Sequence, residues 1–123
     1  EKSDIYINFE CNSNGAMLSQ YGTSRRDRVF LTDKRITTPK VIPFFGSDDK
    51  GYFWGVQFII SFSLIKKIYG DKKLSPNHRM KCNFYKCGDD TASPHYGCWN
   101  NISLEKPDFH CPAFLGDIII GAL

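Results

Sequence analysis

The chain has 123 residues, a length that fits a single domain over residues 1–123 with its own hydrophobic core. Hydrophobic residues make up 41% of it and aromatic residues 15%, which excludes an intrinsically disordered chain. The net charge of +3 is small, but residues 24–40 carry +4 and residues 66–86 carry +6. The apolar runs are too short to cross a bilayer, so no membrane-spanning segment is expected.

The first third of the chain predicts a short helix followed by strands. Ser13 or Asn14 would cap a helix over residues 16–21, which the Gly-Thr-Ser triplet after it would end. Residues 28–32 predict a strand, and residues 35–38 predict its return strand after a turn. The next segment, residues 41–45, is punctuated by prolines and predicts an edge strand or a loop.

The clearest strand signal lies in residues 54–62, where large apolar side chains alternate with smaller or polar ones. The period then changes, and residues 64–69 predict either a short helix, which Ser63 would cap and Gly70 would end, or merely the end of the strand. Further strands are expected at residues 80–86, 96–99 and 117–120. Strands outnumber helices, so the expected fold class is α+β, with one or two short helices packed on an antiparallel sheet.

Five cysteines indicate an oxidising folding route, and their odd number leaves at least one thiol without a partner in the chain. The residues that could be drawn as a zinc site are Cys82, Cys87, Cys98, Cys111, His95 and His110. They lack the tight Cys-x2-Cys spacing of zinc sites, so disulfides are favoured and no metal is expected. A start at Glu rather than Met and the sequon Asn101-Ile102-Ser103 both favour secretion.

Two kinds of RNA chemistry fit the residue types. A ribonuclease with a rearranged site would use His95 with Glu105 or His110 as base and acid, and Arg28 as the cation for the phosphate. An RNA-binding module would use the basic stretches beside an aromatic cluster. The cluster is Phe44, Phe45, Tyr52, Phe53 and Trp54, of which most are expected in the core and Tyr52 and Phe53 are expected to be free. The candidate contacts to RNA or to a protein partner are Arg25, Arg26, Arg28, Arg35, Lys66, Lys67, Lys72 and Lys73.

Asn8-Phe9-Glu10-Cys11 near the start and Cys111 near the end resemble the RNase-like effectors secreted by powdery mildew fungi. These are the RNase-like proteins associated with haustoria, or RALPH effectors. The resemblance implies a helix packed on a curved antiparallel sheet, as in microbial ribonucleases, and a Cys11–Cys111 disulfide. That bond would close a loop of about 100 residues and contribute on the order of 4–5 kcal/mol. The other three cysteines would supply a second pair and a spare thiol.

The resemblance also implies a function without catalysis. Asp27-Arg28-Val29-Phe30 and Pro94-His95-Tyr96 are similar to catalytic segments of active ribonucleases, but their order is reversed and no segment supplies the general base. The expected function is a secreted fungal virulence or avirulence effector, monomeric and without a cofactor. It would be translocated into the plant cell and bind a host protein, an immune receptor or RNA. The alternatives are the basic RNA-binding module and the rearranged secreted ribonuclease.

Overall fold

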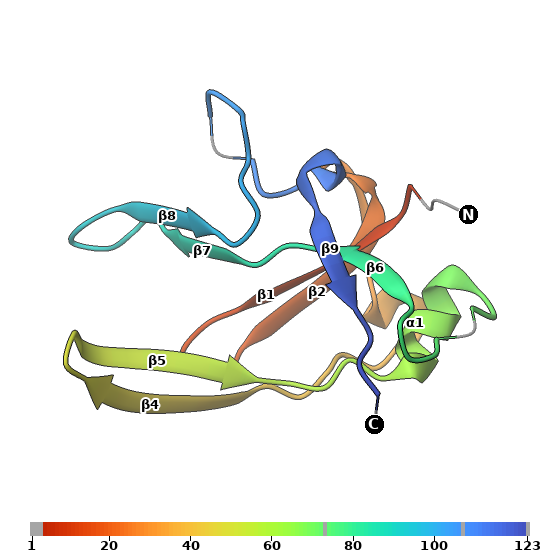
Figure 1. The fold of residues 1–123 in the computed structure, drawn as a ribbon, viewed down its shortest axis with the longest axis horizontal. Coiled ribbons are helices and arrows are strands. Elements are labelled where there is room, and N and C mark those ends of the chain that lie inside the picture. Colours follow the sequence, from red (N-terminus) through yellow and green to blue (C-terminus); the bar gives the residue numbers. More distant parts are fainter. Residues whose placement is uncertain (1–3, 73, 107, 123) are drawn as a thin grey trace. The chain divides into compact units, whose positions relative to one another are not determined.

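The computed structural model describes residues 4–72, 74–106 and 108–122. The chain forms two compact units, residues 1–72 (unit 1) and residues 73–123 (unit 2), and each is described by itself. Within the described ranges there are nine β-strands, one α-helix and two 3-10 turns (Figure 1). The described part of the chain holds no helix of the length and apolar character needed to cross a membrane. The single domain expected over residues 1–123 stays a prediction.

A three-stranded antiparallel sheet, sheet A, opens unit 1. Its strands, in spatial order, are β1 (Tyr6–Cys11), β2 (Met17–Ser24) and β3 (Asp27–Phe30). Asn12 Oδ1 closes the β1–β2 turn by accepting hydrogen bonds from the backbone N–H groups of Asn14 and Ala16, at 3.0 and 3.1 Å. This side-chain turn leads residues 16–21 into a strand. The predicted helix over residues 16–21 is therefore wrong.

Leu31, directly after β3, is the centre of the unit 1 core. Its side chain is 0% exposed, and it packs with Ile36 and Leu64. The partly buried side chains that surround this cluster are Ile7, Phe9, Tyr21 and Ile68. One face of sheet A is thereby covered, because Ile7, Phe9 and Tyr21 project from the same side of their strands.

The backbone of Leu31 also fixes the turn that follows β3. Its N–H donates to the Ser19 carbonyl at 3.1 Å, and its carbonyl accepts from the N–H groups of Lys34 and Ile36 at 3.1 and 3.0 Å. The chain passes through η1 (Thr32–Lys34), and Arg35 then adopts φ 55 in the left-handed region. The predicted return strand over residues 35–38 is wrong, because this turn takes the place of a hairpin.

Strands β4 (Ile42–Asp48) and β5 (Gly51–Gln57) form a separate two-stranded hairpin. Asp48 Oδ1 accepts from the Lys50 N–H at 2.8 Å, and Gly51 supplies the positive φ of 118° that the tight turn requires. The strand predicted within residues 41–45 is confirmed. The strand predicted over residues 54–62 is confirmed only as far as Gln57, where β5 ends.

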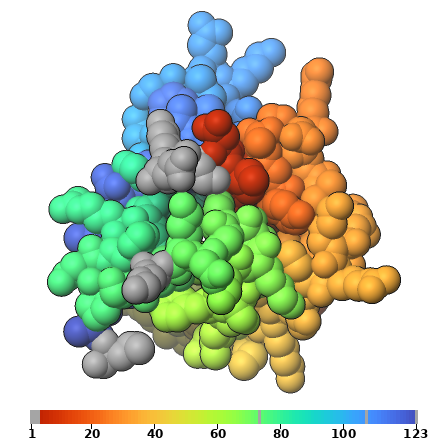
Figure 2. Space-filling model, turned by 90° about the vertical axis from the view of Figure 1, so that its right-hand side faces the viewer, coloured from red at the N-terminus to blue at the C-terminus, as the bar shows by residue number. Residues whose placement is uncertain are grey.

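The helix predicted at residues 64–69 is present as α1 (Phe62–Tyr69). It buries Leu64 and Ile65, and Figure 2 shows α1, in light green, at the surface of the molecule. Ser61 caps the helix, rather than Ser63, since Ser61 Oγ accepts from the Leu64 N–H at 3.2 Å. Gly70 ends the helix at φ 77, as predicted.

We expect Leu31→Ala to lower the free energy of unfolding by about 2–5 kcal/mol, because it leaves a cavity at the fully buried centre of unit 1. Urea denaturation followed by circular dichroism measures this loss. Ile59→Ala is the matched control, since Ile59 is 79% exposed and its truncation should change stability by less than about 0.5 kcal/mol. Equal losses from the two variants would contradict this account of the core.

Unit 2 is built from two short antiparallel pairs and a 3-10 turn. β6 (Arg79–Cys82) pairs with β9 (Gly116–Ile119), and β7 (Tyr85–Gly88) pairs with β8 (His95–Cys98). The strands predicted at residues 96–99 and 117–120 correspond to β8 and β9. The strand predicted over residues 80–86 is divided between β6 and β7.

Asn83, which lies between β6 and β7, holds three segments of unit 2 together. Its Nδ2 donates to the carbonyls of Asn100 and Phe114 at 2.8 and 3.1 Å. Its Oδ1 accepts from the backbone N–H groups of Phe84 and Asn100 at 2.9 and 2.8 Å. The amide thus uses both of its hydrogens and both lone pairs of its oxygen. No other residue type of this size offers the same four bonds.

Asn83→Asp should destabilise the chain by about 2–6 kcal/mol, because a carboxylate would face two carbonyl oxygens that now receive hydrogen bonds. The shape of the side chain is nearly unchanged, so the loss reports on hydrogen bonding alone. Thermal unfolding measures it. Asn101→Asp, at the exposed position that follows Asn100, is the control and should unfold close to the wild-type temperature. A wild-type melting temperature for Asn83→Asp would refute the role of this amide.

The structure corrects the expected fold class. The chain is mostly β, and its one described α-helix has eight residues. Within the described ranges the strands form one three-stranded and three two-stranded sheets, in place of the single curved sheet of a microbial ribonuclease. The expected ribonuclease-like α+β fold is therefore wrong.

Candidate functional site

The outward face of sheet A gathers polar side chains from all three strands. Successive side chains of a strand point to opposite faces, so Asn8, Glu10 and Gln20 lie on the face opposite the core contacts Ile7, Phe9 and Tyr21. The register places Asn8 opposite Gln20. On the same face, the next pair in one direction along the strands is Arg28 with Gly22, and the next pair in the other direction is Glu10 with Leu18. We define the polar face as Asn8, Glu10, Gln20 and Arg28.

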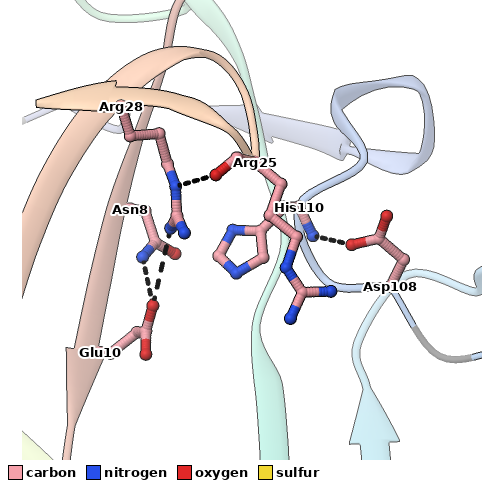
Figure 3. A network of polar contacts seen from close by, with 6 residues as sticks. All are labelled: Asn8, Glu10, Arg25, Arg28, Asp108 and His110. Carbon is pink, nitrogen blue, oxygen red and sulfur yellow. Dashed lines mark hydrogen bonds and ion pairs between the residues drawn. The ribbon is translucent and has the colours of Figure 1, made fainter.

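Hydrogen bonds hold three of these side chains in place (Figure 3). Asn8 Nδ2 donates to Glu10 Oε1 at 2.7 Å, and Arg28 Nη1 lies 3.7 Å from the same oxygen. Arg28 Nε donates to the Arg25 carbonyl in the β2–β3 turn at 3.0 Å. The Arg28 side chain is only 14% exposed, whereas that of Glu10 is 54% exposed. The guanidinium is therefore ordered by the sheet, and the carboxylate reaches solvent.

A shallow hollow of about 410 Å³ opens at the Glu10 end of the polar face. Its lining residues are Glu10, Cys11, Asn12, Ala16, Met17 and Leu18. Its size falls within the range of about 300–1,000 Å³ that is typical of small-molecule clefts. The hollow combines a carboxylate with apolar side chains at the β1–β2 turn.

The polar face offers a mixed set of donors and acceptors. An amide gives and accepts hydrogen bonds, a carboxylate accepts them, and a guanidinium donates from a rigid planar group. Hydroxyl groups also give and accept, so neighbouring hydroxyls on one molecule can be bound by such a set at two points. The arrangement suits a neutral, hydroxyl-rich ligand better than a polyanion, because Glu10 partly compensates the charge of Arg28.

The candidate RNA contacts that the structure describes lie on separate elements of unit 1. Arg25 and Arg26 lie in the β2–β3 turn, and Arg35 follows η1. Lys66 and Lys67 lie on α1, and Lys66 is ion-paired with Asp71. Lys72 follows the helix, and Lys73 lies outside the described residues. Arg28 is the member of the predicted set that belongs to the polar face.

Within unit 2, the structure does not pair His95 with Glu105. His95 Nδ1 lies 2.8 Å from the Ser93 carbonyl, and the His95 ring covers Gly88, on the face of the β7–β8 hairpin opposite Tyr96. Glu105 instead lines a hollow of about 210 Å³ together with Tyr96. His95 is thus the first residue of β8, next to the turn of the hairpin. Its proposed pairing with Glu105 is wrong.

All five cysteines are free thiols in the structure. Cys11 belongs to unit 1 and Cys111 to unit 2, so the expected Cys11–Cys111 disulfide would join the two units and stays a prediction. Burial raises the pKa of the Cys11 and Cys82 thiols. In the described part of the chain, no group of three or more His, Cys, Asp or Glu residues is arranged to hold a metal ion.

Asp89 connects two side chains of the β7–β8 hairpin. It accepts hydrogen bonds from the Tyr96 hydroxyl and from Cys87 Sγ, the latter at 3.1 Å. The bond from Tyr96, followed by that from Cys87, lowers the pKa of Asp89. The bond to Asp89 raises the pKa of the Cys87 thiol, since it stabilises the protonated form.

Asp89→Asn should therefore lower the pKa of Cys87 and increase its thiolate fraction at pH 8. Because the thiolate is the reactive form, the thiol should then react faster. We expect alkylation of Cys87 by iodoacetamide to become several-fold faster, as measured by peptide mass spectrometry. Asp90→Asn is the matched control, one residue further along the same turn, and should leave the rate unchanged. A slower or unchanged rate in Asp89→Asn would contradict the hydrogen bond.

Residues 1–120 match the model of a protein family described as Carbohydrate-binding family 9, and the chain belongs to this family. The chain is also similar to the crystal structure of a candidate carbohydrate-binding protein from Bacteroides uniformis ATCC 8492, at 32% sequence identity and a TM-score of 0.71. That similarity covers 97% of this chain and 56% of the other, so this chain spans little more than half the length of its structural relative. No curated protein matches the chain.

These similarities overturn the resemblance drawn from the sequence. The RNase-like effector assignment is wrong, because the family match extends over residues 1–120 whereas the resemblance depended on two short segments at the ends. The expected function as a fungal effector is wrong for the same reason. The RNA-binding and ribonuclease alternatives also lack support from the family, and an immune receptor or RNA as partner loses its basis.

Three of the four polar-face residues were not predicted as site residues from the sequence. Asn8, Glu10 and Gln20 alternate with the apolar residues of β1 and β2, and that period of two was the available signal. The segment Ile7-Asn8-Phe9-Glu10 alternates as clearly as any strand in the chain. Only Arg28 was singled out, for its charge.

Proposed function

We propose that the chain is a carbohydrate-binding module that binds a glycan through the polar face of sheet A. Membership of a carbohydrate-binding family supports the class of ligand. The observation that carries the site is the ordered set of an amide, a carboxylate and a guanidinium on one sheet face beside a hollow. In this proposal Arg28 and Asn8 donate to sugar hydroxyls, and Glu10 accepts from them.

The proposed module has no catalytic role. Hydrolysis of a glycosidic bond ordinarily uses two carboxyl groups that flank the bond, about 5–9.5 Å apart. The polar face contributes one carboxylate, Glu10, and that carboxylate is already engaged by Asn8 and Arg28. The arrangement therefore favours binding over cleavage. We extend the proposal to secretion, which the cysteines and the sequon favour, because structural polysaccharides lie outside cells.

Affinity electrophoresis through gels that contain β-glucan, xylan, mannan or galactan tests this function. At least one polysaccharide should retard the wild-type protein. Arg28→Ala should weaken that binding about 10- to 100-fold, because it removes charge-assisted hydrogen bonds worth about 1.5–3 kcal/mol. Gln20→Ala should weaken it less, because a neutral hydrogen bond contributes less.

Lys66→Ala is the matched control, since it removes a cation from α1, outside the polar face. Relative to its own mobility in a gel without polysaccharide, it should be retarded as strongly as the wild-type protein. Circular dichroism checks that Arg28→Ala is folded, and Gln20→Ala tests the same face without disturbing the ion pair. No retardation of the wild-type protein by any of the four polysaccharides, or retention by Arg28→Ala and Gln20→Ala at wild-type strength, would defeat the proposal.

A further inference from the structure

Aromatic rings reach the surface in both units, and the two units hold them differently. In unit 1, both faces of the β4–β5 hairpin carry rings whose exposed fractions run from 40% for Trp54 to 98% for Tyr52. The expectation that most of the cluster Phe44, Phe45, Tyr52, Phe53 and Trp54 lies in the core is therefore wrong. In unit 2, two rings instead meet at the hollow of about 210 Å³ beside the β7–β8 hairpin. This hollow belongs to unit 2, whereas the polar face belongs to unit 1.

The two rings form adjoining walls of the hollow. Tyr96 comes from β8, Phe109 comes from the segment that leads to β9, and both line the hollow. Their ring centroids lie 6.2 Å apart and their planes meet at 64°, so the rings stand as two walls of a corner. Tyr85, on the same face of the hairpin as Tyr96, stacks on Phe109 with the ring centroids 4.5 Å apart. The corner is thus held in place by the protein, and a ligand would spend little free energy on ordering it.

A hydrogen bond makes the Tyr96 ring a better partner for a positive charge. The Tyr96 hydroxyl donates to Asp89, and this bond raises the pKa of the hydroxyl, which keeps its proton. Because hydrogen-bonded groups polarise one another, a hydroxyl that donates to a carboxylate shifts electron density toward its own oxygen and ring. The face of an aromatic ring attracts cations that lie within about 6 Å of its centre. The corner therefore suits a cation.

The rest of the lining favours a cation that needs no hydrogen bonds. Glu105 is exposed and brings a carboxylate to the hollow, while Ile102 and Leu104 bring apolar surface. A primary ammonium has three N–H donors, and each costs free energy if it loses water without gaining an acceptor. A quaternary ammonium has no N–H group, and its methyl groups suit an aromatic and apolar lining.

The size of the hollow limits what it can hold. Its volume of about 210 Å³ is smaller than the roughly 300–1,000 Å³ of clefts that take drug-sized ligands. A single compact head group fits such a space better than an extended molecule. The hollow therefore combines a small size, two aromatic walls and one carboxylate.

From this arrangement we propose that the hollow binds a quaternary ammonium group such as that of choline, with Tyr96 and Phe109 as aromatic walls and Glu105 as the counter-charge. The proposal does not depend on glycan binding, since it uses other residues in the other unit. Both attractions require the positive charge, because a ring face and a carboxylate each hold a cation electrostatically. A neutral molecule with the shape of choline should therefore bind much more weakly.

Titration of the full chain with choline chloride, followed by NMR of the aromatic side chains, tests the site against sodium chloride at the same concentrations. The Tyr96 and Phe109 ring signals should shift and saturate with choline. The neutral analogue 3,3-dimethylbutan-1-ol, which has carbon in place of the nitrogen, should bind about tenfold more weakly or less. Phosphocholine, compared with choline, distinguishes a choline ester from the free cation. Tighter binding of either one supports the site and assigns the source of the ammonium group.

Two variants should weaken choline binding. Tyr96→Leu keeps an apolar side chain but removes a ring, and should weaken it about two- to tenfold. Glu105→Gln keeps the shape of an exposed side chain, and should weaken it about two- to fivefold through the lost charge. Phe84→Leu is the matched control for the ring, since Phe84 is 65% exposed in unit 2 and does not line the hollow. Asp117→Asn, on β9, is the control for the charge, and both controls should bind as the wild-type protein does.

Three results would overturn the site. The first is the absence of a saturable shift at up to about 100 mM choline, which is weaker binding than a ring pair with a carboxylate should give. The second is wild-type affinity in both Tyr96→Leu and Glu105→Gln. The third is equal binding of 3,3-dimethylbutan-1-ol, which would assign the hollow to apolar contact alone. Arg28→Ala should bind choline normally, so failure of the polar face and failure of this site can be told apart.

Discussion

The burial of Leu31 beneath sheet A is the constraint on which the candidate site depends. Because strand side chains alternate with a period of two, packing Ile7, Phe9 and Tyr21 against the core places Asn8, Glu10 and Gln20 on the opposite face. A slip of one residue in the pairing of β1 with β2 would exchange the two faces completely. The hydrogen bond that the Leu31 N–H donates to the Ser19 carbonyl ties the end of β3 to β2, and so joins the strand that carries Arg28 to the rest of the sheet. The polar face is thus a product of core packing as much as of its own residues.

The two units reach order by different physical routes. Unit 1 has an apolar cluster with a fully buried leucine, which frees its outer surfaces to carry polar and aromatic groups. Unit 2 is stabilised in part by the Asn83 amide, which makes all four of its hydrogen bonds. The stacked rings of Tyr85 and Phe109, 4.5 Å apart, contribute as well. Directional bonds of this kind specify a backbone path closely, since each depends on angle as well as distance. Short strands joined by long irregular segments benefit most from them.

How far the sequence predicted the structure depended on whether a signal was local. The helix α1 and its end at Gly70 followed from spacing alone, and so did the alternating part of β5. β1 was missed, and β2 was mistaken for a helix, because Asn12 and its neighbours suit a helix cap as well as a turn. Neighbouring rings in Phe44-Phe45 and in Tyr52-Phe53-Trp54 must point to opposite faces of their strands, yet pattern alone cannot say which faces a third layer covers. The family assignment failed because Phe9-x-Cys11 is too short to be specific.

Pro43 gives the exposed hairpin a further property, which concerns solubility. A two-stranded ribbon with aromatic rings on both faces and open edges has the features from which intermolecular sheets grow. Pro43 lies within β4, opposite Val56, and its ring nitrogen has no hydrogen to offer to another strand. An incoming chain would meet a gap in the donor pattern near the start of that edge. The chain can therefore keep its rings in contact with water while β4 remains a poor template for aggregation.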